Sequence, residues 1–223
     1  MIGFLKTLFR NKVSLDRKSD LSEKFSEIYS KNIFGGKESR SGEGSNLVQT
    51  TEIRRELPKL VKEFGIKTFL DAPCGDWFWM RETALGVEKY TGVDIVNSLI
   101  EKNQQQFGND TINFVSLNLV EDPLPQSDLI FCRDCLVHLT YCDIQTIVKN
   151  FKNSKSTYLL TTTFTNRADN ADLIGNDIWR PLNLVLPPFN FPKPLKLIDE
   201  KCTEYNGMFA DKHLGLWLLK DIN

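Results

Sequence analysis

The stretch Thr68-Phe69-Leu70-Asp71-Ala72-Pro73-Cys74-Gly75-Asp76 decides the fold. Its apolar first half is typical of a buried strand, and this strand ends in a carboxylate that leads into a turn with a glycine. A second apolar run, at 90–95, carries Asp94 near its end. Two strands that end in this way place carboxylates and free backbone N–H groups at one edge of a sheet. That edge is where doubly wound sheets hold nucleotide-like cofactors.

Strands and helices alternate on both sides of this stretch. The apolar runs of strand length are 67–72, 90–95, 112–117, 128–132, 157–163, 195–202 and 213–219. Helical apolar spacing covers 53–64, 77–85, 98–107 and 144–151. Pro58 is predicted to kink or divide the first of these helices, and Thr140 opens the last with a capping box. The last two strands are separated by a short turn at Asn206-Gly207, so we expect them to pair antiparallel.

The pattern predicts an α/β fold: a Rossmann-like, mostly parallel sheet of seven strands that ends in an antiparallel pair. Residues 1–45 are predicted to form an N-terminal helical and loop arm, and residues 46–223 the main domain. The arm ends in the Gly/Ser-rich stretch 34–45, which is either a flexible linker or an ordered loop that captures an anion with Arg40. The neighbouring aromatic residues Tyr29 and Phe34 favour the ordered loop.

Composition bears on whether the protein binds nucleic acid and on where in the cell it is found. The net charge is −1, without the excess of Lys and Arg typical of nucleic-acid binders. No run reaches transmembrane length, and no signal peptide is predicted. Residues 1–12 form a short basic amphipathic segment, which packs on its own domain or a partner subunit, or contacts a membrane surface. We expect a cytoplasmic protein.

The cysteines are interpreted as reduced thiols that pack as small apolar groups. They are Cys74, Cys132, Cys135, Cys142 and Cys202. Cys132 and Cys135 form a CxxC that Cys142 follows, but a fourth ligand at the spacing of a zinc site is missing, so no metal is predicted.

S-adenosylmethionine (SAM) requires an acid for its ammonium group, an acid for its ribose hydroxyls and a slot for its adenine. Asp71 stands where the first acid belongs, and Asp94 follows at about the spacing of a ribose-binding acid. Asn118-Leu119 lies just beyond the third predicted strand and suits an adenine edge. A nicotinamide dinucleotide would require a GxGxxG turn after the first strand, which is missing, so SAM is favoured.

On these residues the chain resembles the class I SAM-dependent methyltransferases over about residues 60–219. Residues 71–77 match their first motif, although of its three alternating glycines only Gly75 is kept, with Pro73 and Trp77 in the other two places. Residues 90–94 match the second motif. The resemblance implies cofactor contacts from Asp71, Ala72, Pro73, Cys74, Gly75, Trp77, Asp94, Ile95, Asn118, Leu119, Cys132 and Arg133.

A narrower likeness covers nearly the whole chain. It is carried by four segments: 36–42, 71–76, 132–139 and 177–183. Together they resemble a bacterial branch of these methyltransferases that is linked to surface-polysaccharide assembly.

In this family the residues after the fourth strand face the methyl group, which here means Arg133, Asp134 and His138. His138 is our candidate general base and Asp134, four residues earlier, its orienting partner; the alternative is that His138 only packs. The segment lacks the Asn/Asp-Pro-Pro-aromatic signature of many nitrogen methylators, so oxygen is the predicted acceptor atom.

Three arginines, Arg40, Arg133 and Arg180, are candidates to bind an anionic acceptor such as a phosphate, or else to form ordinary ion pairs. Trp179 is a candidate to stack on a sugar or to close over the pocket. The full predicted acceptor set is Ser39, Arg40, Ser41, Arg133, Thr163, Trp179, Arg180 and Asn183.

The prediction is therefore a SAM-dependent enzyme that O-methylates a small anionic metabolite or a sugar for surface glycan (capsule) assembly. An RNA methyltransferase is the first alternative, but it requires a basic strip with exposed aromatic residues. A non-catalytic scaffold with this fold is the second, and the presence of both Asp71 and Asp94 argues against it.

Overall fold

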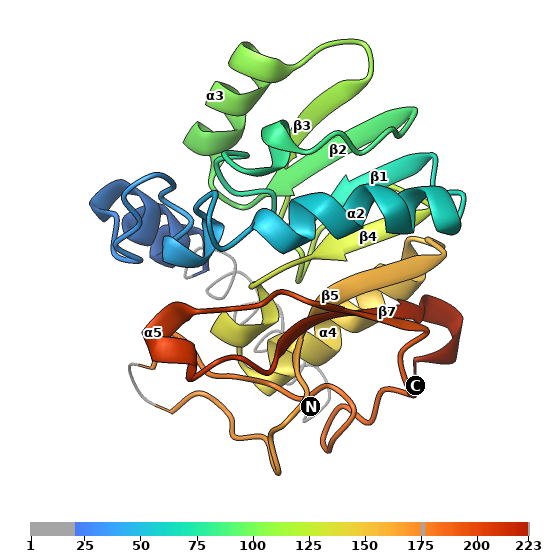
Figure 1. Cartoon of the computed structure of the whole chain (residues 1–223). Coiled ribbons are helices and arrows are strands. Elements are labelled where there is room, and N and C mark those ends of the chain that lie inside the picture. Colours follow the sequence, from blue (N-terminus) through green and yellow to red (C-terminus); the bar gives the residue numbers. More distant parts are fainter. Residues whose placement is uncertain (1–20, 175–176, 223) are drawn as a thin grey trace, which may run out of the picture.

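The computed structural model describes residues 21–174 and 177–222. Within these residues one sheet of seven strands has the order β3-β2-β1-β4-β5-β7-β6 (Figure 1). The strands are β1 (Thr68–Asp71), β2 (Lys89–Asp94), β3 (Ile112–Ser116), β4 (Leu129–Cys132), β5 (Tyr158–Phe164), β6 (Lys196–Asp199) and β7 (Lys212–Leu218). β1 to β5 pair in parallel, whereas β7 is antiparallel to both β5 and β6. The predicted fold class is confirmed, including the terminal antiparallel pair.

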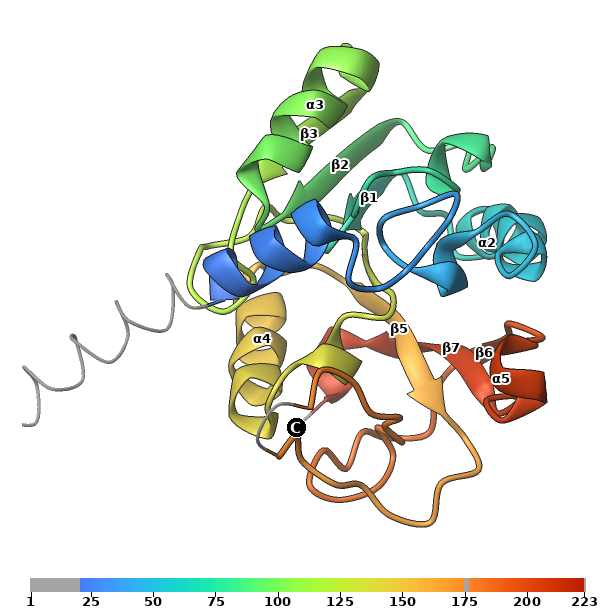
Figure 2. The ribbon, with the colours of Figure 1, turned by 90° about the vertical axis from the view of Figure 1, so that its left-hand side faces the viewer.

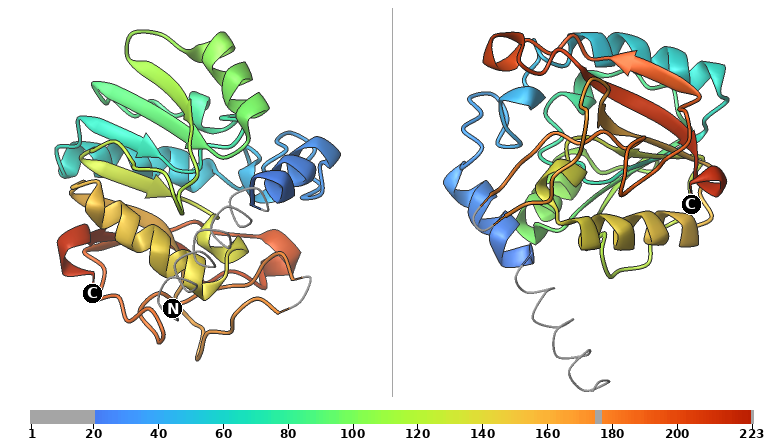
Figure 3. Two further views of the ribbon diagram at one scale, coloured as in Figure 1. Left: turned by 180° about the vertical axis from the view of Figure 1, so that it is seen from behind. Right: turned by 90° about the horizontal axis from the view of Figure 1, so that it is seen from below.

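Helices cover both faces of this sheet. The described helices with assigned bounds are α2 (Thr51–Glu63), α3 (Asn97–Phe107), α4 (Tyr141–Asn153) and the short α5 (Glu204–Gly207). α2 lies in front of the sheet in Figure 1, and α4 comes to the front when the molecule is seen from behind in the left panel of Figure 3. Side chains of the two helices belong to separate apolar clusters. Each cluster removes one face of the parallel strands from water, as parallel sheets require.

Two local features of the helices follow from their sequences. The side chain of Thr140 accepts a hydrogen bond from the Asp143 N–H, so the predicted cap opens α4. Pro58 lies inside α2, which nevertheless runs as one helix. Burial of Ile53, Leu57 and Leu60 on one face of α2 offsets the backbone hydrogen bond that proline cannot donate.

The segment 77–85 is not the helix that its apolar spacing predicts. It contains only a 3₁₀ turn, η2 (Met80–Glu82). Trp77 has a left-handed φ of 56°, which a right-handed helix does not accommodate. Its ring packs instead against Phe107 and Phe114, at centroid distances of 5.0 and 5.2 Å. This segment therefore follows long-range aromatic contacts rather than local periodicity.

The N-terminal arm lies across the edge of the sheet where the parallel strands end (Figures 1 and 2). Residues 21–31 are helical and are followed by an irregular loop with a 3₁₀ turn, η1 (Glu43–Ser45). This loop makes specific contacts with the main domain: the Ser39 hydroxyl and the Arg40 N–H both donate hydrogen bonds to Asp76. The predicted amphipathic segment 1–12 lies outside the described residues. The boundary between residues 45 and 46 stays a prediction.

Candidate functional site

One cavity of about 160 Å³ opens at the carboxyl ends of β1, β2 and β4. The strand order β3-β2-β1-β4 puts the residues at the ends of these strands, or just beyond them, side by side along one edge. From β3 to β4 they are Asn118, Asp94, Asp71 and Asp134, and all four line the cavity. The geometric expectation for Asp71 and Asp94 therefore holds: neighbouring parallel strands bring them to the same edge.

The turn after β1 forms the floor of this cavity, and Pro73, Cys74, Gly75 and Trp77 all line it. Gly75 has φ 53°, and its N–H donates to Asp94 Oδ2 over 3.1 Å. Trp77 takes a similar left-handed φ, so it reproduces a backbone conformation that glycine adopts freely. Gly92 on β2 leaves room for neighbouring side chains, since a Cβ there would lie 2.7 Å from the Phe114 ring on β3 and 3.0 Å from Cys74 Sγ in the turn. Ile95 and Leu119 also line the cavity, whereas Ala72 and Cys132 are buried without lining it.

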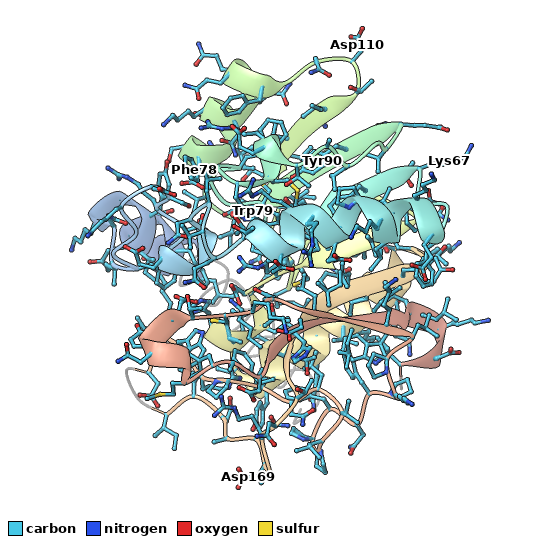
Figure 4. All side chains as sticks on the ribbon, viewed as in Figure 1. Lys67, Phe78, Trp79, Tyr90, Asp110 and Asp169 are labelled. Atoms are coloured by element: carbon cyan, nitrogen blue, oxygen red, sulfur yellow. The ribbon has the colours of Figure 1, made fainter. Side chains whose placement is uncertain are left out.

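Asp71 is a buried carboxyl group at the centre of this edge. The hydroxyl of Tyr90 donates to its Oδ2. Burial raises the pKa of Asp71 to about 8, because the ionised form has little solvation there. Figure 4 shows Tyr90 and Trp79 inside the molecule, while Asp110 and Asp169 lie at its periphery. A buried carboxyl group whose charge lacks a full partner favours a cationic ligand beside it.

Asp94 links the end of β2 to the turn. Its two oxygens accept hydrogen bonds from the N–H groups of Gly75 and Val96. Burial raises the pKa of Asp94 to about 6, and these two hydrogen bonds limit the rise. Each oxygen keeps a further lone pair for a ligand hydroxyl.

Asn118 presents an unsatisfied donor at the other end of the cavity. Its Oδ1 accepts a hydrogen bond from the Val120 N–H over 3.0 Å. Its Nδ2 is buried and has no hydrogen-bond partner among the described residues. A heterocycle with ring nitrogen acceptors would satisfy this amide, so the donor set at this end fits an adenine.

Beyond β4 the chain turns sharply at Asp134, which has a left-handed φ of 51°. His138 ends the following 3₁₀ turn, η3 (Leu136–His138), and lines the cavity. Its Nδ1–H donates to the Ile178 carbonyl over 2.5 Å, and its ring lies 4.8 Å from that of Phe34. This hydrogen bond leaves Nε2 as the acceptor nitrogen. Burial lowers the pKa of His138, so the imidazole is neutral near pH 7.

The predicted partnership between His138 and Asp134 differs from the hydrogen bonds observed. Both side chains line the cavity, but the Ile178 carbonyl orients the imidazole. Asp134 Oδ2 accepts from Lys212 Nζ over 2.6 Å instead. The predicted partner rested on helical spacing, and the turn at Asp134 breaks that spacing before η3 begins.

Two of the three predicted anion-binding arginines form hydrogen bonds or ion pairs with other residues of this chain. Arg133 is buried, and its NH2 lies 2.8 Å from Glu200 Oε2. Arg180 does not line the cavity and donates to the carbonyls of Leu136, Leu139 and Ala171. Arg40 is exposed where it lines the cavity, and its NH1 donates to the carbonyls of Tyr29 and Ser30. The structure does not bring the three guanidinium groups together on one ligand.

The other residues predicted to bind the methyl acceptor also fall into two groups, those that line the cavity and those that do not. Ser41 lines the cavity, whereas Ser39, Thr163, Trp179 and Asn183 do not. Trp179 packs 4.8 Å from the Phe209 ring, and Thr163 Oγ1 accepts from the Leu184 N–H over 3.1 Å. These side chains hold the loop after β5 in place.

The sequence did not identify most of the arm residues that line the cavity. These are Leu21, Phe25, Ile28, Tyr29, Phe34 and Ser45. The helical spacing of the apolar residues in 21–28 was the available signal, but spacing alone does not show which surface a helix covers.

Asp76, on the turn after β1, holds the arm over the cavity. Its Oδ1 accepts from the Ser39 hydroxyl, and its Oδ2 accepts from the Arg40 N–H, both over 2.8 Å. Ser39 is only 2% exposed. The turn that forms the cavity floor therefore also anchors the loop that covers it.

Replacing Ser39 with Ala should loosen this anchor. We expect the free energy of unfolding to fall by about 1–2 kcal/mol, because a hydrogen bond to a charged group is lost. Trypsin should then cleave faster at Lys37 and Arg40, which are both exposed. Urea denaturation and limited proteolysis measure the two effects. Ser30→Ala is the control, since the Ser30 hydroxyl donates to the Glu27 carbonyl of its own helix and not to Asp76. Equal behaviour of the two variants would contradict the anchor.

The described part of the chain also bears on metal binding and on membrane insertion. Residues 21–174 and 177–222 contain no group of three or more His, Cys, Asp or Glu side chains placed to hold a metal ion. No helix among these residues is long and apolar enough to cross a membrane.

Comparison with known proteins bears on the fold. No protein-family model and no curated protein matches this sequence. Among solved structures, the N-methyltransferase NodS from Bradyrhizobium japonicum WM9 matches with a TM-score of 0.55 at 14% identity, covering 78% of this chain and 98% of that chain. NodS in complex with S-adenosyl-L-homocysteine matches with a TM-score of 0.50, also at 14% identity, over 61% of this chain and 73% of that chain.

A third match is the methyltransferase domain of bacterial CtHen1-CN, with a TM-score of 0.46 at 17% identity over 52% of this chain. This chain spans 66% of the length of that domain. At such identities a structural match identifies an architecture and not an activity. The chain has the seven-stranded α/β fold of the class I methyltransferase type.

Proposed function

We propose that this chain transfers a methyl group from SAM to a hydroxyl oxygen of a small acceptor. One observation carries the proposal: Asp71 and Asp94, from neighbouring strand ends, share a cavity with a glycine turn and with Asn118, whose Nδ2 has no hydrogen-bond partner in the described part of the chain. The fold of the chain supports it. Asp71 would lie by the ammonium group, Asp94 by the ribose hydroxyls and Asn118 by the adenine.

Bound SAM would supply a methyl group that is already activated for displacement. The protein then has to orient the acceptor, exclude water and accept a proton. His138 would meet the last requirement, since it lines the cavity as a neutral imidazole whose Nδ1–H is held by the Ile178 carbonyl, which leaves Nε2 as the acceptor nitrogen. The arm residues Phe25 and Tyr29 line the cavity and exclude water from it. A link to surface-polysaccharide assembly stays a prediction from the sequence resemblance.

A polynucleotide acceptor fits this site poorly. Asp134 lines the cavity beyond β4, its neighbours hold it ionised, and a phosphate backbone that entered as the acceptor would meet this negative charge. This distribution of charge favours a small acceptor that enters beneath the arm.

Two measurements test the proposal. Mass spectrometry of the purified protein should find SAM or its demethylated product bound to the chain. A screen with methyl-labelled SAM over small sugars, alcohols and phosphorylated metabolites should then reveal transfer to at least one of them. Absence of both bound cofactor and transfer from folded protein would refute the proposal.

The pH dependence of cofactor binding follows from the raised pKa values. Asp71, with a pKa of about 8, and Asp94, with a pKa of about 6, retain protons in the ligand-free protein that an exposed Asp has lost. This difference stabilises the fold fully below the unfolded pKa of 3.8, and the contribution is lost as pH rises through the folded values. A bound cation favours the ionised carboxylates, so binding releases protons.

We therefore expect the affinity for SAM to rise between about pH 6 and pH 7.5. Calorimetric titrations in two buffers with different ionisation enthalpies measure the protons released. Asp71→Asn should remove most of the release at about pH 7. Uptake of protons, or no exchange at all in the unmodified protein, would contradict this assignment.

A further inference from the structure

The carboxylate of Asp134 occupies the acceptor end of the cavity, and its two oxygens have different surroundings. Oδ2 lies 2.6 Å from Lys212 Nζ and 3.3 Å from Arg133 NH1. Oδ1 has one weaker contact in the described part of the chain, with the Thr162 hydroxyl at 3.4 Å. The side chain is 26% exposed and lines the cavity. Oδ1 therefore has capacity for a hydrogen bond from a ligand.

This carboxylate is held ionised by its neighbours. Burial alone would raise the pKa of Asp134, but the charges of Lys212 and Arg133 outweigh burial and hold the pKa well below its usual range. An ionised carboxylate only accepts hydrogen bonds, so Oδ1 cannot act as an acid toward the acceptor.

The cations behind Asp134 are in turn neutralised by Glu200. Arg133 NH2 lies 2.8 Å and Lys212 Nζ lies 3.5 Å from Glu200 Oε2. Arg133 NH2 also donates to the carbonyl of Gly44 in the arm. Both cationic side chains are only 5% exposed. Each of the two positive charges is therefore already paired with carboxylates of the protein.

The neighbouring imidazole of His138 also offers a hydrogen-bond acceptor. His138 lines the same end of the cavity and directs Nδ1–H at the Ile178 carbonyl, which leaves Nε2 as a second acceptor. This end therefore offers two hydrogen-bond acceptors, and the cationic side chains of Lys24 and Arg180, whose charges act on His138, do not line the cavity. A phosphate or carboxylate placed here would face a carboxylate and an imidazole lone pair. A ligand with two adjacent donors would satisfy both acceptors.

We propose that Asp134 binds a hydroxyl or ammonium group that neighbours the methylated hydroxyl, so that the acceptor is a vicinal diol or an amino alcohol without an anionic group at its reacting end. Unphosphorylated sugar rings belong to this class. The inference rests on the proposed function. In the reaction, the hydroxyl oxygen forms the new C–O bond while His138 Nε2 takes its proton. The departing sulfur keeps the electron pair of the broken C–S bond.

Four small rings that differ by a single substituent test this proposal. They are 1,2-cyclohexanediol, 2-aminocyclohexanol, cyclohexanol and 2-hydroxycyclohexyl phosphate. Methyl transfer from labelled SAM is measured for each probe with the full chain, and binding of each probe to protein loaded with S-adenosylhomocysteine is measured by saturation-transfer NMR. We expect the diol and the amino alcohol to bind, and to react with a kcat/KM about tenfold or more above that of cyclohexanol. The 2-hydroxycyclohexyl phosphate, which keeps the hydroxyl but carries an anion beside it, should do neither.

The variant Asp134→Asn adds a second measurement. It should reduce the advantage of the diol over cyclohexanol to about twofold or less, because the charged acceptor is lost. If this variant fails to fold, the ranking of the four probes on the unmodified protein still decides. Equal kcat/KM for the diol and cyclohexanol, preference for the phosphate, or binding of none of the probes would overturn the inference. Calorimetry on the same preparation separates the causes: absence of SAM binding refutes the proposed function, whereas SAM binding with the wrong ranking refutes only the acceptor class.

Discussion

Replacing His138 with Gln is expected to lower kcat by about 10²- to 10⁴-fold while the Kd for SAM changes by less than about twofold. The imidazole is neutral, and the Ile178 carbonyl fixes its tautomer, so Nε2 is the acceptor that an amide side chain does not reproduce. His138 lines the cavity beyond β4, whereas the residues that fit the cofactor follow β1, β2 and β3. Removal of the base should therefore affect chemistry and not cofactor affinity. Single-turnover transfer to the acceptor found by the methyl screen measures kcat, and calorimetry measures Kd.

The chain offers a matched control for this variant. His213, on β7, does not line the cavity and lies near the Asp211 carbonyl at its Nδ1. His213→Gln should leave both kcat and Kd close to those of the unmodified protein. Equal loss of kcat and affinity in His138→Gln, or loss of neither, would exclude His138 as the base. Melting temperatures of both variants show whether the fold is retained.

Replacing Asp94 with Ala is expected to weaken SAM binding by about a hundredfold. The carboxylate would accept the ribose hydroxyls, and it also accepts the N–H groups of Gly75 and Val96 that shape the turn. Loss of hydrogen bonds to a charged group costs about 3 kcal/mol in this setting, which is about a hundredfold in Kd. Calorimetric titration measures the change. Asp110→Ala is the control, because Asp110 lies exposed at the periphery of the molecule (Figure 4). A Kd within about threefold of the unmodified value would contradict the role of Asp94.

The sequence predicted the sheet well because its signal is local. Buried parallel strands appear as short apolar runs, and each predicted run contains most of a strand of the structure. The position of Asp71 and Asp94 follows from the same property, since the ends of neighbouring parallel strands meet at one edge. The place of Asn118 at this edge follows too, because it lies two residues beyond the end of β3.

The remaining features depend on contacts between residues far apart in the sequence. Trp77 leaves the helical pattern because its ring has partners on α3 and β3. The guanidinium group of Arg133 is of a type that binds anions, but the carboxylate of Glu200, 67 residues away in the sequence, neutralises its charge. Arg180 similarly donates to carbonyls near Leu136. No spacing rule shows whether an arginine faces a ligand or its own fold, and that difference changes the expected acceptor from an anion to a hydroxyl-rich molecule.

Titration of SAM into clean, folded protein at about pH 7.5, followed by isothermal calorimetry, tests the central claim most directly. We expect binding of one SAM per chain with a Kd on the order of 1–100 μM, and no measurable binding of a nicotinamide dinucleotide. Absence of heat from SAM, while the protein shows a cooperative melting transition, would contradict a donor site at the ends of β1 and β2.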